Sequence, residues 1–171
     1  MLFRSEDEDG NLPDIIDGNQ INELIKNKDT VRTMLHKLMT NGLKVENGDK
    51  LGKTIIFTNR DENAEHIVET FNKEYPHLGQ DFCVKITNKV EKKKSLFAQF
   101  KTKDKYPQIA VSVDMLDTGV DVPEILNLVF FRKVMSKSKF WQMVGRGTRL
   151  CPNVFGQGQD KKEFLIFDYF G

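Results

Sequence analysis

The chain has 171 residues, a length that suits one α/β domain with a sizeable core and leaves no room for a second catalytic domain. Its 26 basic and 25 acidic side chains give a formal net charge of +1, which excludes a global basic field, so any contact with DNA must be local. Two cysteines exclude a disulfide framework or a zinc cluster, and the lack of an apolar N-terminal segment predicts a cytoplasmic protein without membrane contact.

The first fifty residues fall into two parts. Residues 1–20 are acidic and polar and contain glycine and proline, which predicts a linker or a fragment end. Apolar residues then recur at helical spacing, so residues 21–50 are predicted to form a helical segment that packs beside the main domain. Within this segment, Asp29 is expected to cap the second helix and Asn41-Gly42 to end it.

Residues 51–171 alternate between short apolar runs and helical patterns. Asn59 and Glu62 are expected to form a capping box for a helix that Pro76 closes. The alternation predicts an α/β domain of three layers, with a mainly parallel sheet flanked by helices on both faces. Strands are expected at 54–58, 82–86, 108–113, 126–131 and 164–167, and later helices at 93–100 and 138–144.

A loop rich in polar residues follows the strand expected at 108–113. Residues 112–123 read S-V-D-M-L-D-T-G-V-D-V-P, so they would lie at the carboxyl end of that strand, where open α/β sheets bind ligands. Gly119 and Asp121 are therefore candidate nucleotide-binding residues, because a carboxylate accepts hydrogen bonds from ribose hydroxyls. The alternative is that Asp121 only shapes a turn before Pro123.

Two arginines stand close together near the end of the chain. Gln142, Gly145, Arg146, Gly147 and Arg149 spell Q-x-x-G-R-G-x-R. Guanidinium forks match phosphate oxygens, and the glycines allow close approach of the backbone, so both arginines are candidates for stabilising phosphoryl transfer. The alternative is a basic helix end that faces water.

Together, the two loops resemble motifs V and VI of superfamily-two helicases, and residues 53–60 resemble motif IV, the first strand of the second RecA-like lobe. The resemblance runs from about Lys53 to the C-terminus, with the elements in the family's order. Residues 127–151 and 162–169 are most similar to the motor (R) subunits of type I restriction enzymes. Type III restriction subunits are a related alternative.

The resemblance implies a C-terminal RecA-like lobe that completes the ATP site and the DNA track of an ATP-dependent translocase of double-stranded DNA. Arg146 and Arg149 would be catalytic, with Gly119, Asp121 and Gln142 at the nucleotide. Polar residues after the strands would contact DNA phosphates without reading sequence. This set comprises Thr58, Asn59, Arg60, Thr87 and Ser112, each of which also has a structural explanation as a cap, turn former or strand end.

The implied partners are an upstream P-loop lobe, specificity and methyltransferase subunits, and ATP with Mg²⁺. Residues 48–54 only superficially resemble a P-loop, because Asn47 replaces its first glycine and a strand, not a helix, follows. No acidic Mg²⁺ box or metal-ligand spacing occurs, so the isolated chain is expected to be inactive. The alternative function is a module that binds nucleic acid or docks a partner without ATP hydrolysis; a P-loop lobe upstream in the parent gene would separate the two.

Overall fold

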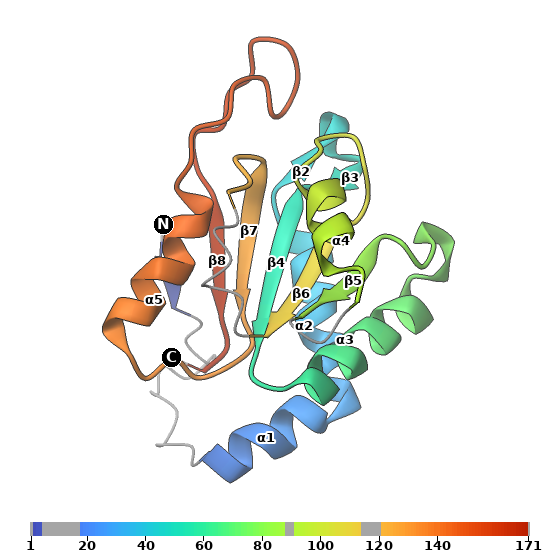
Figure 1. Ribbon diagram of the computed structural model, residues 1–171, viewed down its shortest axis with the longest axis vertical. Helices are drawn as coiled ribbons and strands as arrows, with labels where there is room; N and C mark the ends of the chain where they lie inside the picture. The colour runs from blue at the N-terminus through green and yellow to red at the C-terminus, as the bar shows by residue number, and fades with distance from the viewer. Residues whose placement is uncertain (1, 5–17, 88–90, 114–120, 171) are drawn as a thin grey trace.

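The main sheet of the computed structural model is parallel throughout and runs in the order β1-β8-β7-β4-β6-β5 (Figure 1). The structure describes residues 2–4, 18–87, 91–113 and 121–170. The predicted α/β fold is confirmed. The strands of this sheet are β1 (Leu2–Arg4), β4 (Lys53–Thr58), β5 (Cys83–Ile86), β6 (Ile109–Val113), β7 (Ile125–Phe130) and β8 (Leu165–Asp168).

Helices cover both faces of the sheet. Figure 1 shows α4 in front of it and α2 behind it. A short antiparallel pair and three 3-10 turns complete the described chain. The helices are α1 (Gly18–Lys26), α2 (Lys28–Asn41), α3 (Asp61–Glu74), α4 (Lys93–Phe100) and α5 (Lys137–Val144), the pair is β2 (Lys44–Val45) with β3 (Lys50–Leu51), and the turns are η1 (Glu46–Gly48), η2 (Pro76–Leu78) and η4 (Gly145–Gly147).

Side chains alternate along the central strand and so build two cores. Ile56 packs in the core that α2 and α3 cover, whereas Ile55 and Phe57 pack in the core that α4 and α5 cover. All six residues of β4 are buried, because both faces of a parallel sheet are covered. This explains why the middle of the strand, Ile55 to Phe57, is continuously apolar rather than alternating.

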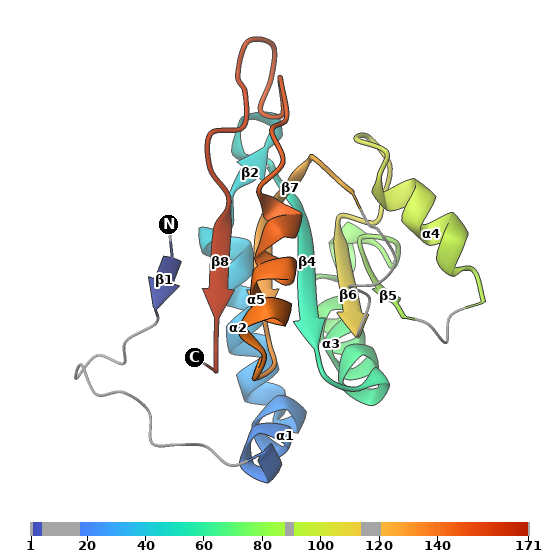
Figure 2. The same cartoon turned by 60° about the vertical axis from the view of Figure 1, so that its left-hand side comes forward.

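The described N-terminal residues differ in detail from the expected linker and helical segment. Most of residues 1–20 lie outside the described part, but Leu2–Arg4 forms β1 beside β8 at the sheet edge (Figure 2), and α1 begins at Gly18. Val31 and Leu38 of α2 share a core with Ile56 of the sheet. The α2 helix therefore packs as an integral layer of the domain.

Two predicted helix caps are wrong. Asn27, not Asp29, caps α2, because its side-chain oxygen accepts the amide of Asp29 at 2.9 Å. Ahead of α3, Arg60 occupies the capping position with extended backbone and no capping hydrogen bond from its side chain. The side chain of Asn59 is already engaged by two other asparagines, so the expected capping box does not form.

Candidate functional site

The helix α5 ends in the 3-10 turn η4, which carries the first of the two arginines. The hydroxyl of Ser136 caps α5 at its start, and Met143 and Val144 anchor its end in the core. Beyond η4, the hydroxyl of Thr148 donates to the carbonyl of Gly145 at 2.9 Å. The arginine turn is therefore held by the core on one side and by a local hydrogen bond on the other.

Gly147 is required by packing within this turn. It is buried, and a β-carbon added there would overlap the ring of Phe164, which lies just before β8. Only a glycine lets the backbone come so close to that ring. The second glycine of the Q-x-x-G-R-G-x-R pattern thus fixes the turn against the body of the domain.

Arg149 and Asp121 meet at the surface. Arg149 Nε lies 3.3 Å from Asp121 Oδ1, and the two side chains are 59% and 53% exposed. Gln142 is exposed and Arg146 is half-buried. The structure therefore brings together one residue from each of the two predicted loops, whereas Gly119 lies outside the described residues.

The position of Asp121 corrects one expectation. Val113 ends β6 at the carboxyl edge of the sheet, but Asp121 stands only four residues before β7 begins at Ile125. The segment between Asp121 and β7 is also folded into a turn, in which the Ile125 amide donates to the Val122 carbonyl at 3.2 Å, so it spans a shorter distance than an extended chain would. Asp121 thus lies toward the amino end of β7, apart from the polar residues at the carboxyl edge.

Thr58 and Ser112 are buried at the carboxyl edge. Thr58 is 0% and Ser112 5% exposed. Thr58 is the last residue of β4 and Ser112 the second-last of β6, and the two strands pair with Phe57 opposite Ser112. Within the described residues, neither hydroxyl oxygen has a hydrogen-bond partner. A buried hydroxyl without a hydrogen bond lowers the stability of the folded state, so Thr58 and Ser112 both make this edge less stable.

Thr87 is engaged by a cluster of charges that the sequence did not reveal. Its hydroxyl donates to Asp61 Oδ1 at 3.0 Å, and Lys85 Nζ lies 3.2 Å from Asp61 Oδ2 and 2.6 Å from Glu65 Oε2. The hydrogen bond to Glu65 is the main cause that raises the pKa of Lys85. A cation on a half-buried strand, with two acids in the first turns of the preceding helix, would have been the only sequence sign of this cluster.

Asn59 and Arg60 complete the predicted DNA set. Asn59 donates to Asn22 at 2.9 Å and accepts from Asn63 at 2.7 Å, so it ties α1 to α3. Arg60 is exposed. The set therefore gathers at one edge, and Arg60 is its one exposed member.

Metal and membrane features are not apparent in the described part of the chain. There, no group of three or more His, Cys, Asp or Glu side chains is arranged to hold a metal ion. None of the described helices is long and apolar enough to cross a membrane.

Comparisons with known proteins add the family context. The sequence matches the helicase conserved C-terminal domain over residues 30–151. It is 42% identical over 124 residues to the EcoKI type I restriction enzyme endonuclease subunit of Escherichia coli K12, covering 68% of this chain and 10% of that subunit. It is 32% identical over 167 residues to the EcoAI endonuclease subunit of Escherichia coli, covering 90% and 20%. The chain thus spans a tenth to a fifth of these relatives.

Solved structures agree with this picture. A fragment from Vibrio vulnificus YJ016, assigned as the HsdR subunit of a type I restriction enzyme, superposes with a TM-score of 0.73 at 27% identity, covering 91% of this chain and 29% of that one. Domain 2 of the DEAD-box helicase Mss116p, solved with an RNA duplex, shares the fold with a TM-score of 0.53 at 16% identity, covering 86% and 50%.

Proposed function

Because the chain belongs to the helicase conserved C-terminal domain family, we propose that it completes the ATP site and half of the DNA track of an ATP-dependent translocase of double-stranded DNA. The similarity to type I restriction endonuclease subunits favours a restriction motor as the parent protein. Its partners would be the upstream P-loop lobe of the same parent and the specificity and methyltransferase subunits of the complex.

The contact between Arg149 and Asp121 carries this proposal. An ion pair between side chains that are more than half exposed contributes only about 0–1 kcal/mol to stability. An anion of higher charge can therefore displace the carboxylate at a small cost in free energy. A triphosphate is such an anion, and the arginine fork is matched to its oxygens. Once released, Asp121 would be free to accept hydrogen bonds from the ribose.

Gln142 and Arg146 extend the nucleotide face. They are four residues apart at the end of α5, a spacing that places side chains on the same side of a helical turn. Gln142 is exposed, so its amide would be open to a nucleotide. Mg²⁺, when bound with ATP, neutralises charge on the transferred phosphoryl group, and its protein ligands would come from the P-loop lobe.

The carboxyl edge would form the DNA track. Arg60 is accessible and would contact a phosphate directly. Thr58 and Ser112 hold unpaired hydroxyls just below the surface, and Thr87 would have to leave Asp61 to reach a phosphate. Such contacts would position the lobe on the duplex without reading its sequence.

ATP hydrolysis by the parent protein tests this function. We expect DNA-stimulated turnover in the parent, its loss in Arg149→Ala, and no turnover by the 171-residue chain alone. If the fold serves only as a binding or docking module, the parent will show no hydrolysis that depends on Arg149. ATP hydrolysis that co-purifies with the isolated chain and is lost in its Arg146→Ala variant would also contradict the proposal.

A further inference from the structure

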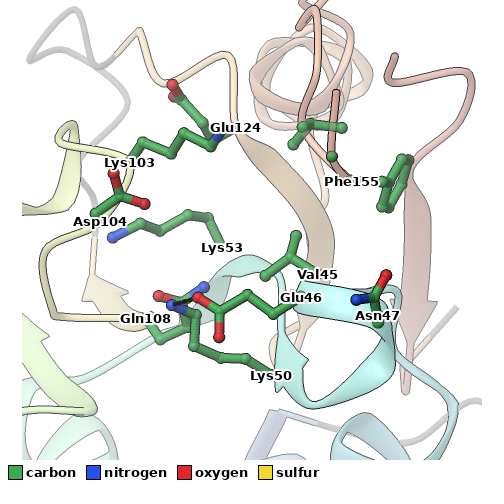
Figure 3. Close-up of a pocket in the computed structure, with 12 residues that line it drawn as sticks. Val45, Glu46, Asn47, Lys50, Lys53, Lys103, Asp104, Gln108, Glu124 and Phe155 are labelled. Carbon is green, nitrogen blue, oxygen red and sulfur yellow. Dashed lines mark ion pairs between the residues drawn. The ribbon is translucent and has the colours of Figure 1, made fainter. Parts of the chain in front are cut away.

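A pocket of about 300 Å³ opens at the amino-terminal end of the sheet (Figure 3). Lys53 is the first residue of β4, and Gln108 and Glu124 immediately precede β6 and β7, so the pocket lies where these strands begin. Figure 3 shows Lys53, Lys103, Asp104 and Glu124 together on one side, Phe155 on the other, and Val45 between them beside Glu46. The pocket therefore offers both charged groups and apolar surface.

The lysines of this pocket are directed to other groups. Lys50 forms an ion pair with Glu46 at 2.7 Å. Lys53 Nζ donates to two backbone carbonyls of the 105–107 loop, at 2.5 and 2.7 Å. Lys103 Nζ donates to a backbone carbonyl at 3.3 Å. None of these contacts is an ion pair with Asp104 or Glu124, whose charges act on Lys53 only from a longer distance.

Three acceptors are left over. Within the described residues, Asp104 and Glu124 form neither an ion pair nor a hydrogen bond, and Glu124 Oε2 is buried. Gln108 is 2% exposed; its amide nitrogen donates to the carbonyl of Leu51 at 2.7 Å, but its oxygen Oε1 has no partner in the described part. The two buried acceptors, Glu124 Oε2 and Gln108 Oε1, favour a ligand that brings donors, and the exposed carboxylate of Asp104 adds negative charge beside them.

We propose that this pocket binds a cationic hydrogen-bond donor on a short apolar stem, an alkylammonium or alkylguanidinium group. The cation would lie against Glu124, Asp104 and Gln108, and the stem would pack on Val45 and Phe155. A neutral donor would satisfy the amide oxygen but would form an ion pair with neither carboxylate. The group could belong to a free amine or to a lysine or arginine side chain of another polypeptide.

Binding of two small probes to the 171-residue chain tests the idea directly. We expect n-butylammonium and n-butylguanidinium to shift the amide NMR signals around Gln108 and Glu124 in a saturable way, with Kd values on the order of millimolar for ligands of this size. n-Butanol and butyrate should give no saturable change. Saturable binding of butyrate instead would assign the pocket to anions through its lysines and overturn the proposal.

Variants locate the binding. Glu124→Gln should weaken the affinity about tenfold, the scale of one lost charged hydrogen bond, and Asp104→Asn should weaken it less. Glu69→Gln makes the same change on the exposed side of α3 and should leave the Kd unaltered. Equal affinities in all variants, or shifts that never saturate, would overturn the proposal. Because Asp104 is exposed, its variant remains decisive even if Glu124→Gln folds poorly.

A backbone-blocked lysine distinguishes the source of the cation. If N-acetyl-lysine methylamide binds as well as n-butylammonium, the pocket accommodates a side chain that emerges from a polypeptide. If only the free amine binds, the ligand is a small molecule. Both results support a cation site, and neither involves ATP or DNA, so failure here leaves the proposed translocase function untouched.

Discussion

The surface around Arg149 and Asp121, here called the arginine face, and the carboxyl edge of the sheet present their polar groups in opposite ways. Arg149 and Asp121 are charged and more than half exposed, and they meet in a pair that a ligand can exchange. Thr58 and Ser112 are neutral and at most 5% exposed, and their hydroxyls lack partners within the described residues. The charged groups of the arginine face can bind a ligand while they stay exposed to solvent. The buried hydroxyls of the carboxyl edge must first move to the surface before a ligand can reach them. Mutations in the two regions should therefore separate turnover from stability.

The largest expected effect is on turnover when either arginine is changed in the parent protein. An ammonium cannot reproduce the fork of a guanidinium, so Arg146→Lys and Arg149→Lys should each lower DNA-stimulated ATP hydrolysis about a thousandfold or more. In the proposed function this charge would act in the closed state of the two lobes, so kcat should fall more than the affinity for ATP.

Thermal unfolding supplies the control for this comparison. Arg149→Lys should leave the Tm nearly unchanged, because an exposed pair contributes little to stability. Near-normal hydrolysis in both variants would refute the catalytic assignment. Loss of folding in both would show that the arginines are structural and that the arginine face is no different from the buried edge.

Lys53 combines the two properties compared above, because its side chain carries an ionisable group, as on the arginine face, but is buried, as at the carboxyl edge. Burial is the main cause that lowers its pKa from 10.5 to about 8. Between these two values the unfolded chain holds a proton that the folded chain has released, so the free energy of unfolding should rise with pH, by at most about 3 kcal/mol.

Urea unfolding of the chain between pH 8 and 10.5 measures this rise. Lys53→Met should lose it relative to the original chain, although it is less stable overall because the carbonyls of Lys105 and Pro107 lose their donor. Lys94→Met removes an exposed lysine and should keep the rise. An identical pH dependence in Lys53→Met would mean that Lys53 does not titrate in this range.

A smaller effect is expected at Asp121. In the parent, Asp121→Ala should weaken the use of ATP about tenfold, the cost of one or two hydrogen bonds, while DNA binding stays nearly constant. The ATP concentration dependence of hydrolysis measures the first quantity and a DNA titration the second. Asp81→Ala, an exposed aspartate elsewhere, serves as the control. Unaltered ATPase parameters would assign Asp121 to shaping the turn before Pro123.

Regular elements could be predicted from the sequence because both faces of the sheet are covered. A strand such as β4 is then a short apolar run, and the helix expected at 93–100 begins and ends at those residues. The pair β2 and β3 was missed, since two-residue strands have no periodicity to detect. The cap at Asn59 was wrong because its side chain bonds to Asn22, 37 positions away, which no local pattern encodes.

The candidate site was predictable only in part. The resemblance named Asp121 and Arg149 separately, and the structure adds that they touch. Thr87 was chosen as a polar residue after a strand, but its burial and its bond to Asp61 depend on how α3 packs across β5. The pocket around Gln108 also depends on tertiary contacts, because its walls come from segments that are distant in the sequence.

The smallest effect concerns Arg60, the accessible member of the DNA set. If it contacts a phosphate, Arg60→Ala in the parent should weaken DNA binding to a similar extent on unrelated sequences and should lower the salt slope by about one. Lys73→Ala removes the same charge at the far end of α3, about 20 Å away by the helical rise, and should change neither quantity. A loss confined to one sequence would indicate base contacts. Equal behaviour of the two variants would mean that the carboxyl edge around Arg60 does not touch the phosphate backbone, because a contact must depend on where the charge lies and not only on its number.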